Sequence, residues 1–174
     1  KLNPILFIVI FFLFSRFFIY YFLQIQPSYP SGQIIDYNFL RENLLDSLIN
    51  LHFQPFLWNL IFGILYKIFD QNFVFMLSYL ANIFISLLIA YYLIKILEYL
   101  KLSNKIIFFT VLFFLFNPNT IFYEQYAPHY AHFSLLMMTQ LLYFFIKFHE
   151  TKNFRYEVLS YVNLLVMSYI WLLF

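Results

Sequence analysis

The chain has 174 residues, of which 64% are hydrophobic, 26% are aromatic and 10% are charged. Soluble domains carry about 25% charged residues, so long apolar runs at this charge density indicate an integral membrane protein. The net charge of +2, without a basic cluster, gives no indication of a nucleic-acid partner, and the lack of cysteine excludes disulfides, thiol nucleophiles and cysteine metal sites.

The first predicted element is a membrane span over residues 2–23, which is long enough to cross a hydrocarbon core of about 30 Å. Arg16 lies in its second half, where the long side chain could reach the nearer interface or contact a phosphate. Pro27, Pro30 and Gly32 then end the helix and indicate a loop.

Two short helices are expected next, in the first outer loop. Residues 37–50 carry Leu40, Leu44 and Leu48 at helical spacing with polar residues around them, which predicts an amphipathic helix along the membrane surface. Residues 55–69 are mostly apolar but too few for a span, which favours a juxtamembrane helix that does not cross.

Four further spans would complete a single transmembrane domain over residues 1–174, an all-α polytopic bundle. They are predicted at residues 73–97, 106–122, 131–148 and 158–174. Because the chain begins with Lys1 and stops within an apolar run, we expect it to be the amino-terminal part of a longer protein.

The charges between the predicted spans define a topology. If the amino terminus is cytoplasmic and residues 55–69 do not cross, the inner side holds seven basic residues and three acidic ones. The outer loops then hold two basic residues and five acidic ones. This bias agrees with the positive-inside rule. It predicts a multi-pass protein of the plasma (inner) membrane with its site facing outside, or of the ER membrane in a eukaryote.

Two outer acidic residues are candidates for chemistry. Asp36 immediately precedes the helix at residues 37–50, so it is either an N-cap or a general base at the membrane surface. Glu124 lies in YEQYAPHY, between two spans, either as a solvated loop carboxylate or as a functional one, since an acid at membrane depth is costly unless it is paired or used. Both loops would emerge on the outer side, so we expect the two carboxylates to approach one cavity.

Histidines, a glutamine and a tyrosine lie in or next to the same two predicted outer loops as these acids. His129 and His132 are three residues apart and could hold a divalent metal with the two acids, or act as interfacial hydrogen-bonding groups. His52 and Gln54 indicate a turn that opens the short helix. Tyr123 belongs either to an aromatic interface belt or to a surface that stacks on sugars.

Taken together, these residues resemble the amino-terminal part of the GT-C-type membrane glycosyltransferases, which include protein O-mannosyltransferases and lipid A aminoarabinose transferases. The segments that carry the resemblance are LLDSLINLHFQPFLWNLIFGILYKIF and LFNPNTIFYEQYAPHY. They contain a surface helix, a His-x-Pro-Pro-like element opening a short apolar helix, and Asn-Pro followed by an aromatic and acidic loop. The chain has Gln54-Pro55-Phe56 where many members have two adjacent prolines.

The resemblance implies juxtamembrane helices in the first outer loop and transfer of a sugar, with inversion, from a polyprenyl-phosphate donor to a lipid, glycan or protein acceptor. The family's first-loop acid, its general base, falls on Asp36. The second outer acid, which in some members positions a metal or the acceptor, falls on Glu124, and with Asp36 and His129 it would form the candidate site for a divalent metal. The other candidate substrate-binding residues are His52, Gln54, Tyr123, and, as cations near the phosphate, Arg16 and Arg41.

A transporter or lipid-flippase subunit is the alternative. It would predict paired charges inside the spans, broken helices at mid-membrane and repeat symmetry. The sequence places its acids in predicted loops and shows no internal repeat, which favours the transferase over this alternative. A non-catalytic membrane subunit is the third hypothesis, and no specific feature of the sequence argues for it.

Overall fold

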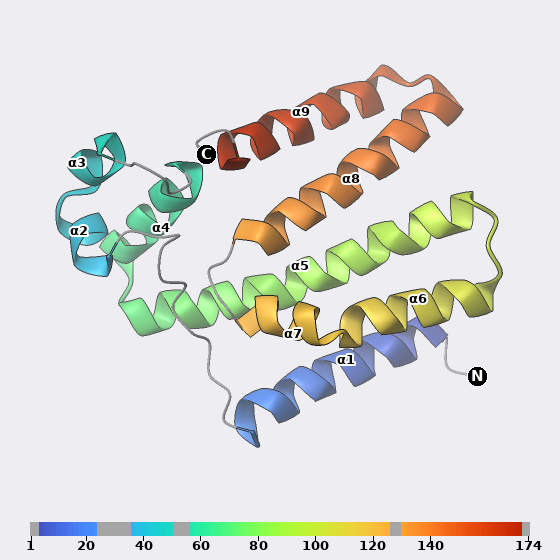
Figure 1. Cartoon of the computed structure of the whole chain (residues 1–174), viewed down its shortest axis with the longest axis horizontal. Coiled ribbons are helices and arrows are strands. Elements are labelled where there is room, and N and C mark those ends of the chain that lie inside the picture. The colour runs from blue at the N-terminus through green and yellow to red at the C-terminus, as the bar shows by residue number, and fades with distance from the viewer. Residues whose placement is uncertain (1–3, 24–35, 51–55, 126–129, 172–174) are drawn as a thin grey trace.

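A computed structural model describes residues 4–23, 36–50, 56–125 and 130–171, and within these ranges every regular element is a helix (Figure 1). This confirms the all-α prediction for the described part of the chain. The elements are α1 (Pro4–Tyr21), α2 (Tyr37–Glu42), α3 (Leu44–Ile49), α4 (Phe56–Ile68), α5 (Gln71–Tyr99), α6 (Asn104–Phe116), α7 (Pro118–Gln125), α8 (Tyr130–Thr151) and α9 (Phe154–Trp171).

Helix α5 is the central element of the bundle. It packs against α8 on one side and against α6 and α7 on the other, while α9 lies along α8 and α1 lies along α6 (Figure 1). The α5–α6 and α8–α9 turns lie at one end of the bundle. Helices α2, α3 and α4, the start of α5 and the end of α1 lie at the opposite end (Figure 1).

The end with the two helical turns is the basic end. Each turn contains a lysine with a left-handed backbone, Lys101 at φ 56° and Lys152 at φ 53°, a conformation that commonly terminates helices. The described basic residues at this end are Lys95, Lys101, Lys105, Lys147, Lys152 and Arg155, and the acidic ones are Glu98, Glu150 and Glu157. Among the described residues, the opposite end exposes two bases, Arg41 and Lys67, together with Asp36, Glu42, Asp46 and Asp70. The charge bias expected from the sequence is therefore a bias between the two ends of the folded bundle.

Two helices of the described part, α5 and α8, are long and apolar enough to cross a membrane, and the bent pair α6 and α7 raises the number to three. With 29 and 22 residues, α5 and α8 are about 43 and 33 Å long at 1.5 Å per residue. The apolar part of α1 (Leu6–Tyr21) is shorter, and α9 carries buried Ser160 and Asn163. The prediction of five spans is thus confirmed only in part.

Two predicted helices are broken in the structure. The amphipathic helix expected at residues 37–50 is divided at Asn43, whose backbone (φ −127°, ψ 52°) is not helical. The predicted span at residues 106–122 is divided at Asn117, where α6 and α7 meet at a bend of 45°. Both expectations of a continuous helix were wrong. The apolar spacing continues on both sides of Asn43 and of Asn117, although the helix ends at each of these two polar residues.

Helices α2, α3 and α4 form a cap over one end of the bundle, and we call them the end cap. Its core contains Leu40, Phe62 and Tyr66, which are buried together with Trp58 of α4. The Trp58 ring lies 5.8 Å from that of Phe133 in α8, so the end cap is attached to the long helices by aromatic packing. At 13 residues, α4 is too short to cross a hydrocarbon core, and it contacts α2, α3, α5 and α9, as expected for a helix that stays at one end.

Candidate functional site: a buried polar network and an exposed acid

The break between α6 and α7 removes the helical N–H partners of two carbonyl groups, those of Phe114 and Leu115. Pro118 has no N–H to donate to the carbonyl of Phe114, and the Asn119 N–H bonds to Asn117 Oδ1 at 2.9 Å instead of to Leu115. The Thr120 hydroxyl donates to Phe114 O at 2.8 Å. The Leu115 carbonyl is left for a donor from another helix, since a buried carbonyl without a partner is costly.

Arg16 of α1 supplies that donor. Its Nη2 donates to Leu115 O at 2.6 Å and to Glu124 Oε1 at 3.1 Å, while Nε donates to Glu124 Oε2 at 2.5 Å. The guanidinium carbon also lies 4.3 Å from the ring centroid of Phe12. Only 3% of Arg16 is exposed, and Glu124 is completely buried. Because two charges removed from water must satisfy each other, this two-point ion pair joins α1 to α7.

Ser86 of α5 and His132 of α8 extend the ion pair. The Ser86 hydroxyl donates to Glu124 Oε1 at 2.5 Å and lies 2.8 Å from His132 Nε2. A hydroxyl has a single proton to donate, so His132 must donate its Nε2–H to Ser86 when Ser86 donates to the carboxylate. We call Arg16, Glu124, Ser86 and His132 the polar network; it connects α1, α7, α5 and α8.

The backbone of α7 is held in the same place by Asn82, one turn before Ser86 on α5. Its Nδ2 lies 3.3 Å from Tyr123 O and 3.4 Å from Glu124 O. Ser78, Asn82 and Ser86 are all buried and four residues apart, so they form one stripe along α5. This stripe of polar residues in an apolar helix is the sequence signal that could have identified Asn82 and Ser86, which the sequence analysis missed.

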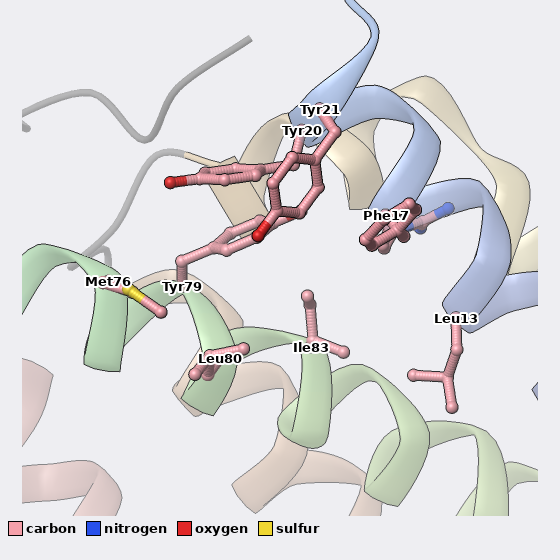
Figure 2. Close-up of a pocket in the computed structure, with 9 residues that line it drawn as sticks. Leu13, Phe17, Tyr20, Tyr21, Met76, Tyr79, Leu80 and Ile83 are labelled. Atoms are coloured by element: carbon pink, nitrogen blue, oxygen red, sulfur yellow. The ribbon is translucent and has the colours of Figure 1, made fainter. Parts of the chain in front are cut away.

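An apolar groove lies between α1 and α5, next to the polar network (Figure 2). Its volume is about 230 Å³, and it is lined by nine residues: Leu13, Arg16, Phe17, Tyr20, Tyr21, Met76, Tyr79, Leu80 and Ile83. Figure 2 shows the rings of Tyr20, Tyr21 and Tyr79 gathered at one end of the groove and Leu13 at the other. Neither Asp36 nor Glu124 lines it.

Asp36 lies outside the network, in the end cap. Its side chain accepts the Asn38 N–H at 2.9 Å, and it is exposed. It is therefore the N-cap of α2, as one of the two interpretations predicted. A cap uses one acceptor position of a carboxylate that has about four, so capping leaves the group able to accept a proton from another molecule.

The other candidate residues are distributed around these two places. Arg41 is exposed and donates to the hydroxyl of Tyr37 on the same face of α2. Tyr123 is half-buried, directly before Glu124 on α7. His52, Gln54 and His129 lie outside the described residues. Within the described ranges, no three His, Cys, Asp or Glu residues are grouped in a way that could hold a metal ion.

Two sequence expectations need correction here. Glu124 is neither a solvated loop carboxylate nor part of an open cavity shared with Asp36, because it lies on α7 with no exposed surface. Arg16 does not reach an aqueous interface, because its guanidinium group is buried against Glu124. Both corrections have one cause. Arg16 and Glu124 form an ion pair although they are 108 positions apart in sequence, and a prediction made from each segment alone does not detect such a pair.

Comparison of the chain with known proteins gave no match to a protein family, to a curated protein or to a solved structure.

Proposed function

We propose that this chain is the amino-terminal part of a membrane glycosyltransferase of the GT-C type, which transfers a sugar from a polyprenyl-phosphate donor on the outer side of a membrane. The observation that carries the proposal is the position of Asp36. It is an exposed carboxylate on the less basic end of an apolar bundle, at the first residue of a cap made of short helices.

The arrangement of the end cap supports the same proposal. The two segments that carry the family resemblance are far apart in sequence but meet in the fold, since Tyr130, the last residue of the second segment, packs on the core of the cap. Asp36 is followed by Tyr37, whose ring lies 4.9 Å from that of Tyr66 in α4. The carboxylate is thus attached to a packed platform at the membrane surface, where a lipid-borne donor and a water-borne acceptor can both arrive.

The proposed reaction needs one base and a leaving group. The acceptor hydroxyl oxygen attacks the anomeric carbon of the donor sugar, its proton passes to Asp36, and the bond to the polyprenyl phosphate breaks with inversion. Arg41, one turn along α2 from Tyr37, is the exposed cation nearest in sequence to this base and would attract the phosphate. Glu124 and Arg16 take no direct part in this scheme, because they are paired with each other inside the bundle and join α1 to α7.

The decisive experiment is a transfer assay. Membranes containing the full-length protein are supplied with radiolabelled sugars on polyprenyl phosphates, and product formation is compared with that of membranes lacking the protein. Product that depends on the protein and on an intact phosphate link supports the proposal. Donors of several sugars that all remain uncleaved, with the protein present and folded, would reject it.

A transporter is the second candidate function, and two features of the structure support it. The paired charges of the polar network and the bend between α6 and α7 are two of the features that this alternative predicts. Reconstitution in sealed vesicles separates the two functions. Protein-dependent movement of a solute or lipid across the bilayer, without cleavage of a sugar donor, would favour the transporter.

A further inference from the structure

We infer that a pocket between α2 and α3 of the end cap binds a neutral sugar ring, so that the acceptor of the proposed transfer is a saccharide. Only the role of acceptor rests on the proposed function, because binding of a sugar does not require transfer. The pocket has a volume of about 390 Å³, within the range of roughly 300–1,000 Å³ that is typical of small-molecule sites. It is lined by Phe39, Asn43, Asp46, Ser47 and Asn50.

One wall of the pocket is a polar face of α3. Its members follow the spacing i, i+3, i+4 and i+7, which places side chains on one side of a helix; they are Asn43, Asp46, Ser47 and Asn50. The other wall is Phe39 of α2, which is 62% exposed. The Ser47 hydroxyl donates to Phe39 O at 3.2 Å, so it holds the aromatic residue beside the polar face.

The polar wall carries hydrogen-bonding groups that the described part of the chain does not use. The Asn43 side chain makes no capping bond to α3. Asn50 Nδ2 donates at 2.8 Å to the backbone carbonyl of Asp46, which leaves the Asp46 carboxylate and the Asn50 side-chain oxygen available. An amide both donates and accepts, whereas a carboxylate accepts only. Water solvates these groups, and a ligand with matching donors and acceptors can replace that water.

The chemistry of the two walls favours a sugar over other classes of ligand. A sugar ring has hydroxyl groups, which both donate and accept, around faces of C–H groups that can pack on an aromatic ring. An ammonium group only donates and would leave the amide N–H groups of Asn43 and Asn50 unpaired. An acyl chain would leave the whole polar wall unpaired, which is costly. Among the described residues, the lining contains Asp46 and no basic residue, so it repels a phosphate or a carboxylate.

The pocket lies next to the proposed base. Asp36 is the N-cap of α2, and Phe39 is the third residue of the same helix. The side chains at these two positions are neighbours, as the capping box demonstrates. A sugar ring that packs on Phe39 can therefore bring one of its hydroxyl groups towards the Asp36 carboxylate. This position suits the acceptor, whose hydroxyl must lose a proton, better than the donor, whose phosphate needs a cation.

The first experiment measures binding to the whole chain in detergent micelles by saturation-transfer NMR. The probes are the methyl glycosides of glucose, mannose, galactose and arabinose, with methyl glucuronide and putrescine as charged comparisons. We expect saturation transfer to at least one neutral glycoside, because its ring protons approach Phe39. Methyl glucuronide should bind about two- to fivefold more weakly than the neutral glycosides, because the exposed Asp46 repels its carboxylate.

Variants of both walls locate the binding. Phe39→Ala removes the aromatic wall and should weaken glycoside binding about two- to tenfold. Phe154→Ala, which changes a 70% exposed phenylalanine of α9, is the matched control and should leave binding unchanged. Asp46→Asn removes the charge and keeps the shape, so it should retain the neutral glycosides and improve binding of methyl glucuronide. Asn43→Ala should weaken binding about two- to tenfold through a lost hydrogen bond, and it provides a second result if Phe39→Ala does not fold.

The second experiment uses the full-length protein in the transfer assay, with the glycosides that bind as acceptors. Phe39→Ala should raise the KM for the acceptor about two- to tenfold. The kcat and the KM for the donor should be unchanged, because the ring holds the acceptor equally in the ground state and the transition state and receives no proton. A variant that lowers kcat and keeps the acceptor KM would contradict a role of Phe39 in acceptor binding.

Three binding results would overturn the inference. They are no saturation transfer to any of the neutral glycosides, binding that is unchanged in both Phe39→Ala and Asn43→Ala, and putrescine binding that is tighter than glycoside binding and is lost in Asp46→Asn. The last would assign the pocket to an amine. Transfer to a peptide or lipid acceptor without glycoside binding would reject this inference and support the proposed function. Glycoside binding without transfer from any donor would do the reverse, so the two failures are distinguishable.

Discussion

Glu124 and Asp36 are both acidic residues at predicted membrane boundaries, yet the fold uses them in opposite ways. Glu124 is completely buried and accepts hydrogen bonds from Arg16 and Ser86. Asp36 is exposed and accepts one backbone N–H within its own short helix. All the acceptor capacity used at Glu124 serves to hold other helices, whereas most of that at Asp36 faces outwards.

The difference shows that burial assigns the role of a carboxylate more strongly than its place in sequence. A charge removed from water is stable only when its neighbours compensate it, so Glu124 is bound to a fixed set of partners. An exposed carboxylate is solvated by water and can exchange that water for a substrate. Glu124 therefore serves to hold helices together, and Asp36 in the end cap is the one of these two carboxylates that another molecule can reach.

The largest expected effect concerns which side of a membrane each end of the bundle occupies. The chain has no cysteine, so a single cysteine at exposed Asn43 in the end cap or at exposed Ser103 in the α5–α6 turn reports its own location. We expect a membrane-impermeant maleimide added outside intact cells to label Asn43→Cys and not Ser103→Cys. Ser103→Cys should react only after the membrane is opened. Labelling of both from outside would contradict the topology.

The second effect tests the exposed carboxylate. Asp36→Asn should reduce sugar transfer by the full-length protein by about 10²–10⁴-fold, the usual contribution of a general base. Expression and membrane insertion should be unchanged, because Asn caps a helix about as well as Asp. Glu42→Gln, which alters an exposed acid on the same helix, is the matched control and should retain activity. Full turnover in Asp36→Asn would assign the base to another residue.

The third effect tests the buried carboxylate. Glu124→Leu leaves Arg16 charged and unpaired inside the bundle, and we expect a loss of about 3–5 kcal/mol in the free energy of unfolding. The double variant Arg16→Met with Glu124→Leu removes both charges and should recover most of that loss. Unfolding in mixed micelles with increasing denaturant measures both. A double variant no more stable than Glu124→Leu would contradict the prediction, because the loss would then not come from the unpaired charge of Arg16.

A smaller effect is expected at Ser86. Ser86→Ala removes the bridge between Glu124 and His132, which should lower the free energy of unfolding by about 1–3 kcal/mol because a buried acceptor loses a partner. Ser78→Ala is the control. Ser78 is also buried on α5 but donates only to Val74 of its own helix, so its loss should change stability by less than about 1 kcal/mol. Equal losses in the two variants would show that the hydrogen bonds of Ser86 to other helices add no stability beyond that of a hydrogen bond within α5.

The smallest effect is expected in the end cap, at Gly63. A Cβ atom at this position would lie 2.3 Å from Leu44 Cδ1, which is the end of a flexible side chain and can move aside. Alanine also favours a helix by about 1 kcal/mol over glycine, so Gly63→Ala should be nearly neutral, whereas Gly63→Leu should separate α3 from α4. Thermal unfolding followed by circular dichroism measures both. A loss above about 2 kcal/mol for Gly63→Ala would mean that the end cap is as rigid as the buried network.

The sequence alone determined the class of this fold and the outline of its elements. Apolar runs with few charges predicted helices long enough to span a membrane, and α5 and α8 fulfil that prediction. The short length of residues 55–69 predicted a helix at one end of the bundle, where α4 is found. An N-cap was one of the two interpretations of Asp36 from its position before a helical repeat, and Asp36 is the N-cap of α2. These features depend on local composition and spacing, which a sequence displays directly.

Only the tertiary structure decided the polar network. Its members come from four helices, and the spacing between Arg16 and Glu124 carries no periodic signal that could link them. Pro118 was visible in the sequence, but the carbonyl of Leu115 and the arginine that donates to it are joined only when α1 packs beside α6. Long-range polar pairs follow from the need of each buried charge and carbonyl for a partner, and the choice among candidate partners is made when the helices pack.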